Sequence, residues 1–130
     1  MGALRVLIVD DEEELVSALV ERLALRGFQA KGVTNGADAL AYLAGAPCDV
    51  VLLDVKMPGI GGLEVIKRIK EQQPSLEVVL LTGHSSAQDA ERGMTLGAFD
   101  YLMKPVKLDD LLRILLTAGA RTGGAAPEGR

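Results

Sequence analysis

The sequence indicates an α/β protein: a single doubly wound (βα)5 domain with a five-stranded parallel sheet and helices on both faces. Short, mostly unbroken apolar runs recur along the chain, as strands buried on both faces do, and segments with helical spacing of apolar residues separate them. This strict alternation of strand and helix is typical of a parallel sheet covered on both sides. The 130 residues are 48% hydrophobic and 25% charged, which is enough apolar material for one core.

Three of the apolar runs have the composition of central strands, and two have that of edge strands. The central candidates are Leu4–Val9, Val50–Leu53 and Val78–Leu81. Phe28–Val33 and Ala98–Leu102 mix apolar with polar or small residues, as half-exposed strands do. With strands two and five at the edges and right-handed crossovers, the simplest strand order is 2-1-3-4-5. The chain then reverses direction between strands one and three, where such sheets bind ligands.

Each expected helix shows apolar residues spaced along one helical face. The clearest repeats are in the first and last helices, at Val16, Leu19, Val20 and Leu23 and at Leu108, Leu111, Leu112 and Leu115. Weaker sets begin at Ala37, Leu63 and Ala87. Residues that favour helix termination follow the first four segments, at Gly27, Gly45, Pro74 and Gly97. Glutamates directly after Asp11 suit the positive end of a helix dipole, so the first helix is expected to start there.

The regular pattern ends near residue 119. From there the sequence consists largely of Gly, Ala, Thr and Pro without periodicity. We therefore expect residues 1–119 to form the domain and residues 120–130 a flexible tail or the stub of a linker. Both a stand-alone domain and a chain without its effector part agree with such a tail.

Charge and cysteine content argue against several classes of function. Acidic residues outnumber basic ones, 18 to 14, and the formal net charge of -4 is opposite to that of a nucleic-acid binder. The single cysteine, Cys48, cannot form an internal disulfide, which favours a reducing cytoplasm. No segment approaches the roughly 20 apolar residues that cross a bilayer, and the N-terminus lacks the apolar run of a signal peptide. We expect a cytoplasmic protein without membrane contact and without direct nucleic-acid binding.

Acidic side chains stand at the ends of two strands that should be neighbours. Asp10 and Asp11 end strand one and Asp54 ends strand three, so the strand order brings three carboxylates together. Like charges this close either hold a proton or share a cation, and an all-oxygen site suits Mg²⁺. The sequence therefore predicts a Mg²⁺ site. The alternative is that these residues cap helices or shape turns, which would be preferred for Asp11 taken alone.

A hydroxyl and an ammonium join the same rim of the sheet. Thr82 ends strand four, and Lys104 follows strand five. Together with a metal ion, they are groups that stabilise a transferring phosphoryl group. No Ser, Cys or His stands as an obvious nucleophile with a base, whereas a carboxylate can attack phosphorus to form an aspartyl phosphate. Asp54, at the end of the middle strand, is the predicted phosphoacceptor. The structural alternatives are a solvated lysine and a threonine that merely ends a strand.

Four short motifs stand in order along these β-α units. They are Val6-Leu-Ile-Val-Asp-Asp-Glu12, Leu52-Leu-Asp-Val-Lys-Met-Pro-Gly59, Leu81-Thr-Gly83 and Tyr101-Leu-Met-Lys-Pro105. Together, over residues 4 to about 118, they resemble the receiver domain of bacterial two-component response regulators. The resemblance implies a flavodoxin-like fold like that of the chemotaxis regulators, with Asp54 as phosphoacceptor. It also implies that Asp10 and Asp11, with Asp54, bind Mg²⁺.

The resemblance implies roles for further residues. The backbone carbonyl of Lys56 would be another Mg²⁺ ligand, and Thr82 and Lys104 would contact the phosphoryl group. Tyr101 matches the aromatic residue that swings inward when Thr82 moves toward the phosphate, although at an edge strand half-buried packing is its alternative. The bond between Lys104 and the following proline is expected to be cis. Lys56 and His84 match variable positions that tune the lifetime of the phosphate.

The implied function is signal transduction by phosphotransfer. The donor would be a sensor histidine kinase or a phosphotransfer protein, and the phosphorylated domain would change the surface of its last two β-α units to control an output partner or domain. Homodimerisation through the same units is compatible with the resemblance, but no motif fixes it. The chain would catalyse its own phosphorylation and dephosphorylation without being a conventional enzyme.

Two other functions stay open at this point. A Mg²⁺-dependent phosphohydrolase would use the same carboxylates as a catalyst, but it lacks an evident acid for the leaving group. A docking module of the same fold would carry a vestigial, unphosphorylated site. A nucleotide or flavin binder is disfavoured, because no Gly-rich loop follows the first strand.

Overall fold

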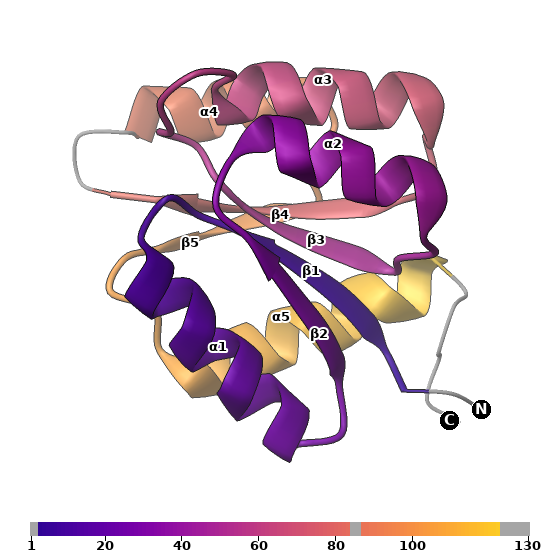
Figure 1. Ribbon diagram of the computed structural model, residues 1–130. Coiled ribbons are helices and arrows are strands. Elements are labelled where there is room, and N and C mark those ends of the chain that lie inside the picture. Colours follow the sequence, from indigo (N-terminus) through magenta and orange to yellow (C-terminus); the bar gives the residue numbers. More distant parts are fainter. Residues whose placement is uncertain (1–2, 84–86, 123–130) are drawn as a thin grey trace.

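Strands and helices alternate along the chain in the computed structural model, which describes residues 3–83 and 87–122 (Figure 1). The strands are β1 (Arg5–Val9), β2 (Gln29–Val33), β3 (Val50–Asp54), β4 (Glu77–Thr82) and β5 (Asp100–Met103). The helices are α1 (Glu13–Leu25), α2 (Gly36–Gly45), α3 (Gly62–Gln72), α4 (Ala87–Thr95) and α5 (Leu108–Thr122). Each strand and helix expected from the sequence is present, with strand ends shifted by at most a residue or two.

The five strands form one parallel sheet in the order β2-β1-β3-β4-β5, as the sequence predicts. The two edge strands are those with mixed composition, and Gln29 and Lys31 of β2 are exposed. In the central pair, Val9 of β1 lies opposite Leu53 of β3. The next residues along these two strands are Asp10 and Asp54. The register of β1 and β3 therefore brings two carboxylates to the same edge of the sheet.

Two layers of helices cover the sheet, with α2, α3 and α4 on one face and α1 and α5 on the other (Figure 1). Successive residues of a strand point to opposite faces. Leu7 of β1 accordingly packs with the first layer, and Val6 and Ile8 pack with the second. Because both faces of β1, β3 and β4 are buried, these strands consist of nearly continuous apolar residues. The polar side chains of these strands therefore stand at their ends, with Asp54 and Thr82 at the carboxyl ends of β3 and β4.

Helix ends follow the stop and start signals of the sequence, except at α5. Helix α1 begins at Glu13, and Gly27 and Gly97, after α1 and α4, have φ angles of 90° and 113° that favour glycine. Helix α5 continues to Thr122, past the expected boundary at residue 119. Residues 123–130 and His84 lie outside the described residues, so the tail stays a prediction. No helix in the described part of the chain has the length and apolar character to span a bilayer.

An ion pair with a buried carboxylate lies at the opposite, amino-terminal end of the strands. Asp49 is 2% exposed and accepts hydrogen bonds from the backbone N–H of Arg5 (2.8 Å) and from its Nε (3.1 Å) and Nη2 (3.0 Å). Burial alone would raise the pKa of Asp49, but its bonds to Arg5 outweigh burial and lower it. This end of the sheet is therefore neutralised by a complete pair, in contrast to the carboxyl end.

Candidate functional site

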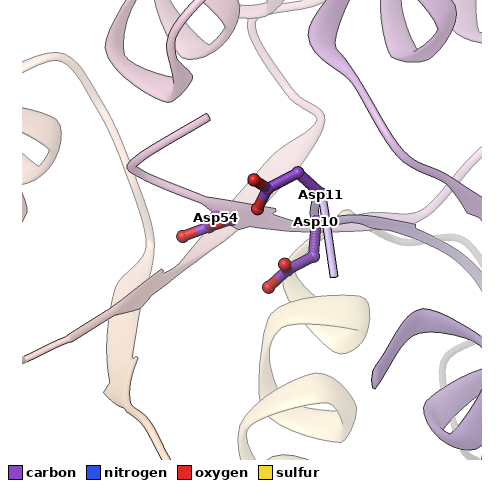
Figure 2. A group of neighbouring side chains, drawn as sticks. All are labelled: Asp10, Asp11 and Asp54. Atoms are coloured by element: carbon purple, nitrogen blue, oxygen red, sulfur yellow. The ribbon is translucent and has the colours of Figure 1, made fainter. Parts of the chain in front are cut away.

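Three carboxylates meet where β1 and β3 end, as Figure 2 shows. One oxygen from each of Asp10, Asp11 and Asp54 lies within 4.8 Å of the others. Asp10 and Asp54 are 0% and 5% exposed, whereas Asp11 is exposed to solvent. The structure therefore brings together the three acidic residues that the sequence singled out, and it buries two of them.

The two oxygens of Asp10 have different surroundings. Oδ1 accepts a hydrogen bond from the backbone N–H of Glu12 (2.9 Å), just before α1 begins. Oδ2 is buried and has no hydrogen-bond partner among the described residues. It lies 2.8 Å from Nζ of Lys104 as an ion pair without hydrogen-bond geometry. The turn-shaping interpretation thus explains Oδ1 of Asp10, whereas Oδ2 accepts no hydrogen bond among the described residues and faces the charge of Lys104.

The donor set of this pocket fits a hard cation. It offers carboxylate oxygens from three residues, no sulfur and no imidazole, and Mg²⁺ prefers oxygen ligands. Asp11 opens the cluster to solvent, so that a bound Mg²⁺ can keep several of its waters. Oδ2 of Asp10, which accepts no hydrogen bond among the described residues, offers a buried oxygen ligand for such an ion. The acidic cluster therefore fits the Mg²⁺ site that the sequence predicts.

Asp54 is held in an environment that disfavours its charge. Its pKa is raised from 3.8 to about 6, mainly by burial and further by repulsion from Asp10 and, more weakly, from Asp11. Lys104, whose Nζ lies 3.7 Å from Oδ2, opposes the rise. So does the backbone N–H of Lys56, which donates to Oδ1 at 3.3 Å. At neutral pH, Asp54 is therefore mostly an ionised carboxylate that an additional cation would stabilise.

Lys104 is the cation that Asp10, Glu12 and Asp54 share. Its Nζ lies 2.8 Å from Oδ2 of Asp10, 3.0 Å from Oε1 of Glu12 and 3.7 Å from Oδ2 of Asp54. Burial alone would lower its pKa, but the hydrogen-bonding and charge interactions with these carboxylates raise it above the ordinary value. Lys104 is thus a fixed positive charge. The peptide bond from Lys104 to Pro105 is cis, as the resemblance implies.

The contact with Glu12 was missed by the reasoning from sequence. Glu12 stands there only as a negative residue at the start of the first helix, yet its carboxylate shares the ammonium of Lys104. Its position directly after the Asp10-Asp11 pair, on the loop that faces Lys104, is the signal that could have revealed it. Glu12 is therefore a fourth acidic residue of the site.

Thr82 and Tyr101 occupy different environments on β4 and β5. Thr82 is 0% exposed, and its hydroxyl donates a hydrogen bond to Sδ of Met103 at 3.1 Å. Tyr101 is 43% exposed at the edge strand β5, so its role as a switch stays a prediction. The side chain of Lys56 points away from the carboxylates, with its Nζ 3.7 Å from Asp89 of α4. The Thr82 hydroxyl and the Lys56 ammonium therefore have partners other than the carboxylates of Asp10, Asp11 and Asp54.

Comparison with known proteins identifies the family. The family model of the response regulator receiver domain matches residues 6–116. The chain is 37% identical over 114 residues to the regulatory protein AtoC of Escherichia coli strain K12, an alignment covering 88% of this chain and 25% of AtoC. It is 38% identical over 108 residues to the DNA-binding transcriptional regulator NtrC of the same organism, covering 83% and 23% of the two chains. The chain thus spans about a quarter of these two relatives.

Solved structures give the same result. The receiver domain of NtrX from Brucella abortus superposes with a TM-score of 0.80 at 32% identity, covering 87% of this chain and 96% of that one. A response regulator receiver domain protein from Clostridium thermocellum gives a TM-score of 0.87 at 30% identity, covering 92% and 97%. With the parallel sheet and the acidic pocket described above, these matches show that the chain belongs to the response regulator receiver domains, the phosphoacceptor domains of two-component systems.

Proposed function

We propose that Asp54 is the residue that accepts the phosphoryl group, in a reaction that depends on Mg²⁺. The observation that carries this proposal is the position of its carboxylate beside both the acidic cluster and Lys104. Asp10 is a poorer nucleophile, because one of its oxygens accepts the N–H of Glu12 and the other lies 2.8 Å from Lys104. The contacts of Asp54 are longer, at 3.3 Å and 3.7 Å, so its oxygens are freer to attack phosphorus.

The surrounding residues support the transfer in distinct ways. The proposed ligands of Mg²⁺ are Asp10, Asp11, Asp54 and the backbone carbonyl of Lys56. When bound, Mg²⁺ supplies positive charge that offsets the repulsion between the carboxylate and the incoming phosphoryl oxygens. Lys104 already lies in the pocket and adds a fixed positive charge for the transferred group. Thr82 would donate its hydroxyl to a phosphoryl oxygen.

The proposed donor is the phosphohistidine of a sensor histidine kinase or of a phosphotransfer protein. An oxygen of Asp54 forms a bond to phosphorus, and the bond between phosphorus and the histidine nitrogen breaks. The electron pair of that bond stays on the imidazole, which leaves and takes up a proton from solvent. Cytoplasmic operation goes with this proposal, because the free thiol of Cys48 suits a reducing compartment.

In this proposal, the surface that responds to phosphorylation is formed by the last two β-α units. Charge on Asp54 would draw Thr82 forward, with Tyr101 following, and would bias two pre-existing surface states. The relative NtrC is named a DNA-binding transcriptional regulator. By analogy, this domain would control an output domain or a partner protein, or pair with a second copy of itself through the same units.

The test is the intact mass of the protein after incubation with acetyl phosphate, with and without Mg²⁺. The expected result is a Mg²⁺-dependent gain of one phosphoryl group, absent from Asp54→Asn and retained by Asp109→Asn, a change at an exposed aspartate of α5. Equal labelling of Asp54→Asn would contradict the assignment. If no form gains mass, beryllofluoride with Mg²⁺ decides the matter. Failure to bind this phosphoryl mimic would replace the proposal with a docking module whose site is vestigial.

Steady turnover separates the proposal from the phosphohydrolase alternative. A receiver releases only the phosphate that it has taken onto Asp54, so release should stop when the donor is exhausted and should not extend to unactivated phosphate esters. Sustained release of phosphate from a range of esters, at rates far above the loss of label from Asp54, would favour a hydrolase. The measurement is free phosphate over time with acetyl phosphate and with simple alkyl phosphates.

A further inference from the structure

Met103 links the buried hydroxyl of Thr82 to the surface of the molecule. The two residues lie opposite each other in the register of β4 and β5. The Thr82 side chain is fully buried, and its hydroxyl donates a hydrogen bond to Sδ of Met103 at 3.1 Å. The thioether of Met103 therefore satisfies a polar group that would otherwise be buried without a partner.

This hydrogen bond excludes the one that phosphotransfer requires of Thr82. A hydroxyl has a single proton to donate, so Thr82 cannot donate to a phosphoryl oxygen while it donates to Met103. A thioether is also a weak acceptor, whereas hydrogen bonds to charged oxygens are roughly twice as strong as neutral ones. A charged phosphoryl group on Asp54 would therefore replace Met103 as the acceptor of the hydrogen bond that the Thr82 hydroxyl donates.

Met103 also borders a groove on the surface. Its side chain is 41% exposed and lines a hollow of ≈ 590 Å³ between α4 and β5, together with Met94 and Tyr101. Loss of the bond to Thr82 would release the thioether to take other rotamers, because methionine has three rotatable side-chain bonds. The shape of this groove is thus tied to the direction in which the Thr82 hydroxyl points.

We propose that Met103 is a positioning residue for Thr82. In the unphosphorylated domain its sulfur holds the Thr82 hydroxyl, and phosphorylation exchanges this hydrogen bond for one to the phosphoryl group and frees the Met103 side chain. The exchange opposes phosphoryl binding in the resting state and couples the site to the groove between α4 and β5. The inference rests on the proposed phosphorylation of Asp54.

The test is the affinity of the full chain for beryllofluoride in the presence of Mg²⁺, measured by calorimetry. Met103→Leu keeps about the same volume but removes the acceptor, so we expect binding about three- to tenfold tighter than in the unsubstituted protein. Met94→Leu is the matched control, because Met94 lines the same groove and is 38% exposed. Its affinity should be unchanged. In a Thr82→Val background, which has no hydroxyl to release, Met103→Leu should have no effect.

The outcomes distinguish this inference from the function on which it rests. If the unsubstituted protein binds no beryllofluoride, both proposals are overturned. If it binds and Met103→Leu matches Met94→Leu, the positioning role of Met103 is wrong while phosphorylation of Asp54 stands. A second measurement needs no substitution in the groove: with ¹³C-methyl methionine, beryllofluoride should shift the Met103 methyl resonance in the unsubstituted protein. An unmoved Met103 resonance at saturating beryllofluoride would also overturn the inference.

Discussion

Asp54 makes the native state sensitive to pH in a direction opposite to that of most aspartates. Its carboxyl keeps its proton up to about pH 6 in the folded domain, whereas an unfolded aspartate loses it near pH 3.8. Between these values the native state binds more protons than the unfolded state, so its stability falls as pH rises. Above about pH 6 the whole destabilising contribution of this charge is present. Below pH 3.8 it vanishes.

Asp54→Asn should therefore stabilise the metal-free domain at pH 7.5 but not at pH 3.5. We expect a gain on the order of 1 kcal/mol in the free energy of unfolding, after allowance for solvent screening. Urea unfolding in the presence of a chelator, repeated at both pH values, measures it. Asp109→Asn, at an exposed site, should leave stability nearly unchanged at pH 7.5. If Asp54→Asn instead lowers the free energy of unfolding at pH 7.5, the charge of Asp54 does not destabilise the native state.

The sequence predicts contacts between individual residues of the site only where the backbone alone brings them together. The convergence of Asp10 and Asp54 follows from the strand order, because parallel strands end at the same edge of a sheet. The contact of Glu12 with Lys104 depends on side-chain rotamers, which no spacing pattern encodes. The bond between Thr82 and Met103 was equally hidden, because methionine in a strand is normally interpreted as an apolar packing residue.

Among the elements, α3 begins directly against the strand that carries Asp54. The backbone N–H of Gly62, its first residue, donates to the carbonyl of Val55 at 3.0 Å. A Cβ at Gly62 would meet the backbone oxygen of Asp54 and lie 2.8 Å from Cα of Val55. Glycine is thus required here by the close approach of two backbones, and this approach sets the path of the loop after Asp54.

Gly62→Ala should destabilise the domain by about 1–3 kcal/mol, because backbone rather than a flexible side chain would have to move. The same change should weaken beryllofluoride binding, since the loop after Asp54 shifts with α3. Gly45→Ala is the matched control: Gly45 ends α2, a Cβ there has no neighbour within 4 Å, and alanine favours the helix. Urea unfolding of both variants measures the difference. Equal stability of the two alanine variants would refute the close-packing argument.

The spacing of large apolar residues does not predict where α5 ends. The sequence turns to small residues near residue 119, yet the helix continues to Thr122. The small residues there are part of the packing: Ala118 is fully buried, and a Cβ at Gly119 would touch a methyl group of Leu4. A helix that approaches its neighbour this closely needs small side chains, so the loss of large apolar residues marks tight packing and not the end of the element.

The two ends of the sheet give the molecule an uneven distribution of charge. At the amino ends of the strands, Asp49 is fully paired with Arg5. At the carboxyl ends, Asp10 and Asp54 share the ammonium of Lys104 with Glu12, and Asp11 adds a further carboxylate to the cluster. The fold thus concentrates its uncompensated negative charge at the place where the strands leave room for a ligand.

A divalent cation that binds only the native state should therefore stabilise the whole domain. At ten times its dissociation constant, Mg²⁺ should raise the free energy of unfolding by about 1.4 kcal/mol and raise Tm by several degrees. Differential scanning calorimetry with increasing Mg²⁺ measures both, and NaCl at matched ionic strength accounts for general screening. Asp10→Asn should lose the stabilisation by Mg²⁺, because the substitution removes a negative charge and weakens the buried oxygen ligand Oδ2. Asp109→Asn should retain it, and equal stabilisation of Asp10→Asn and Asp109→Asn would place the ion elsewhere.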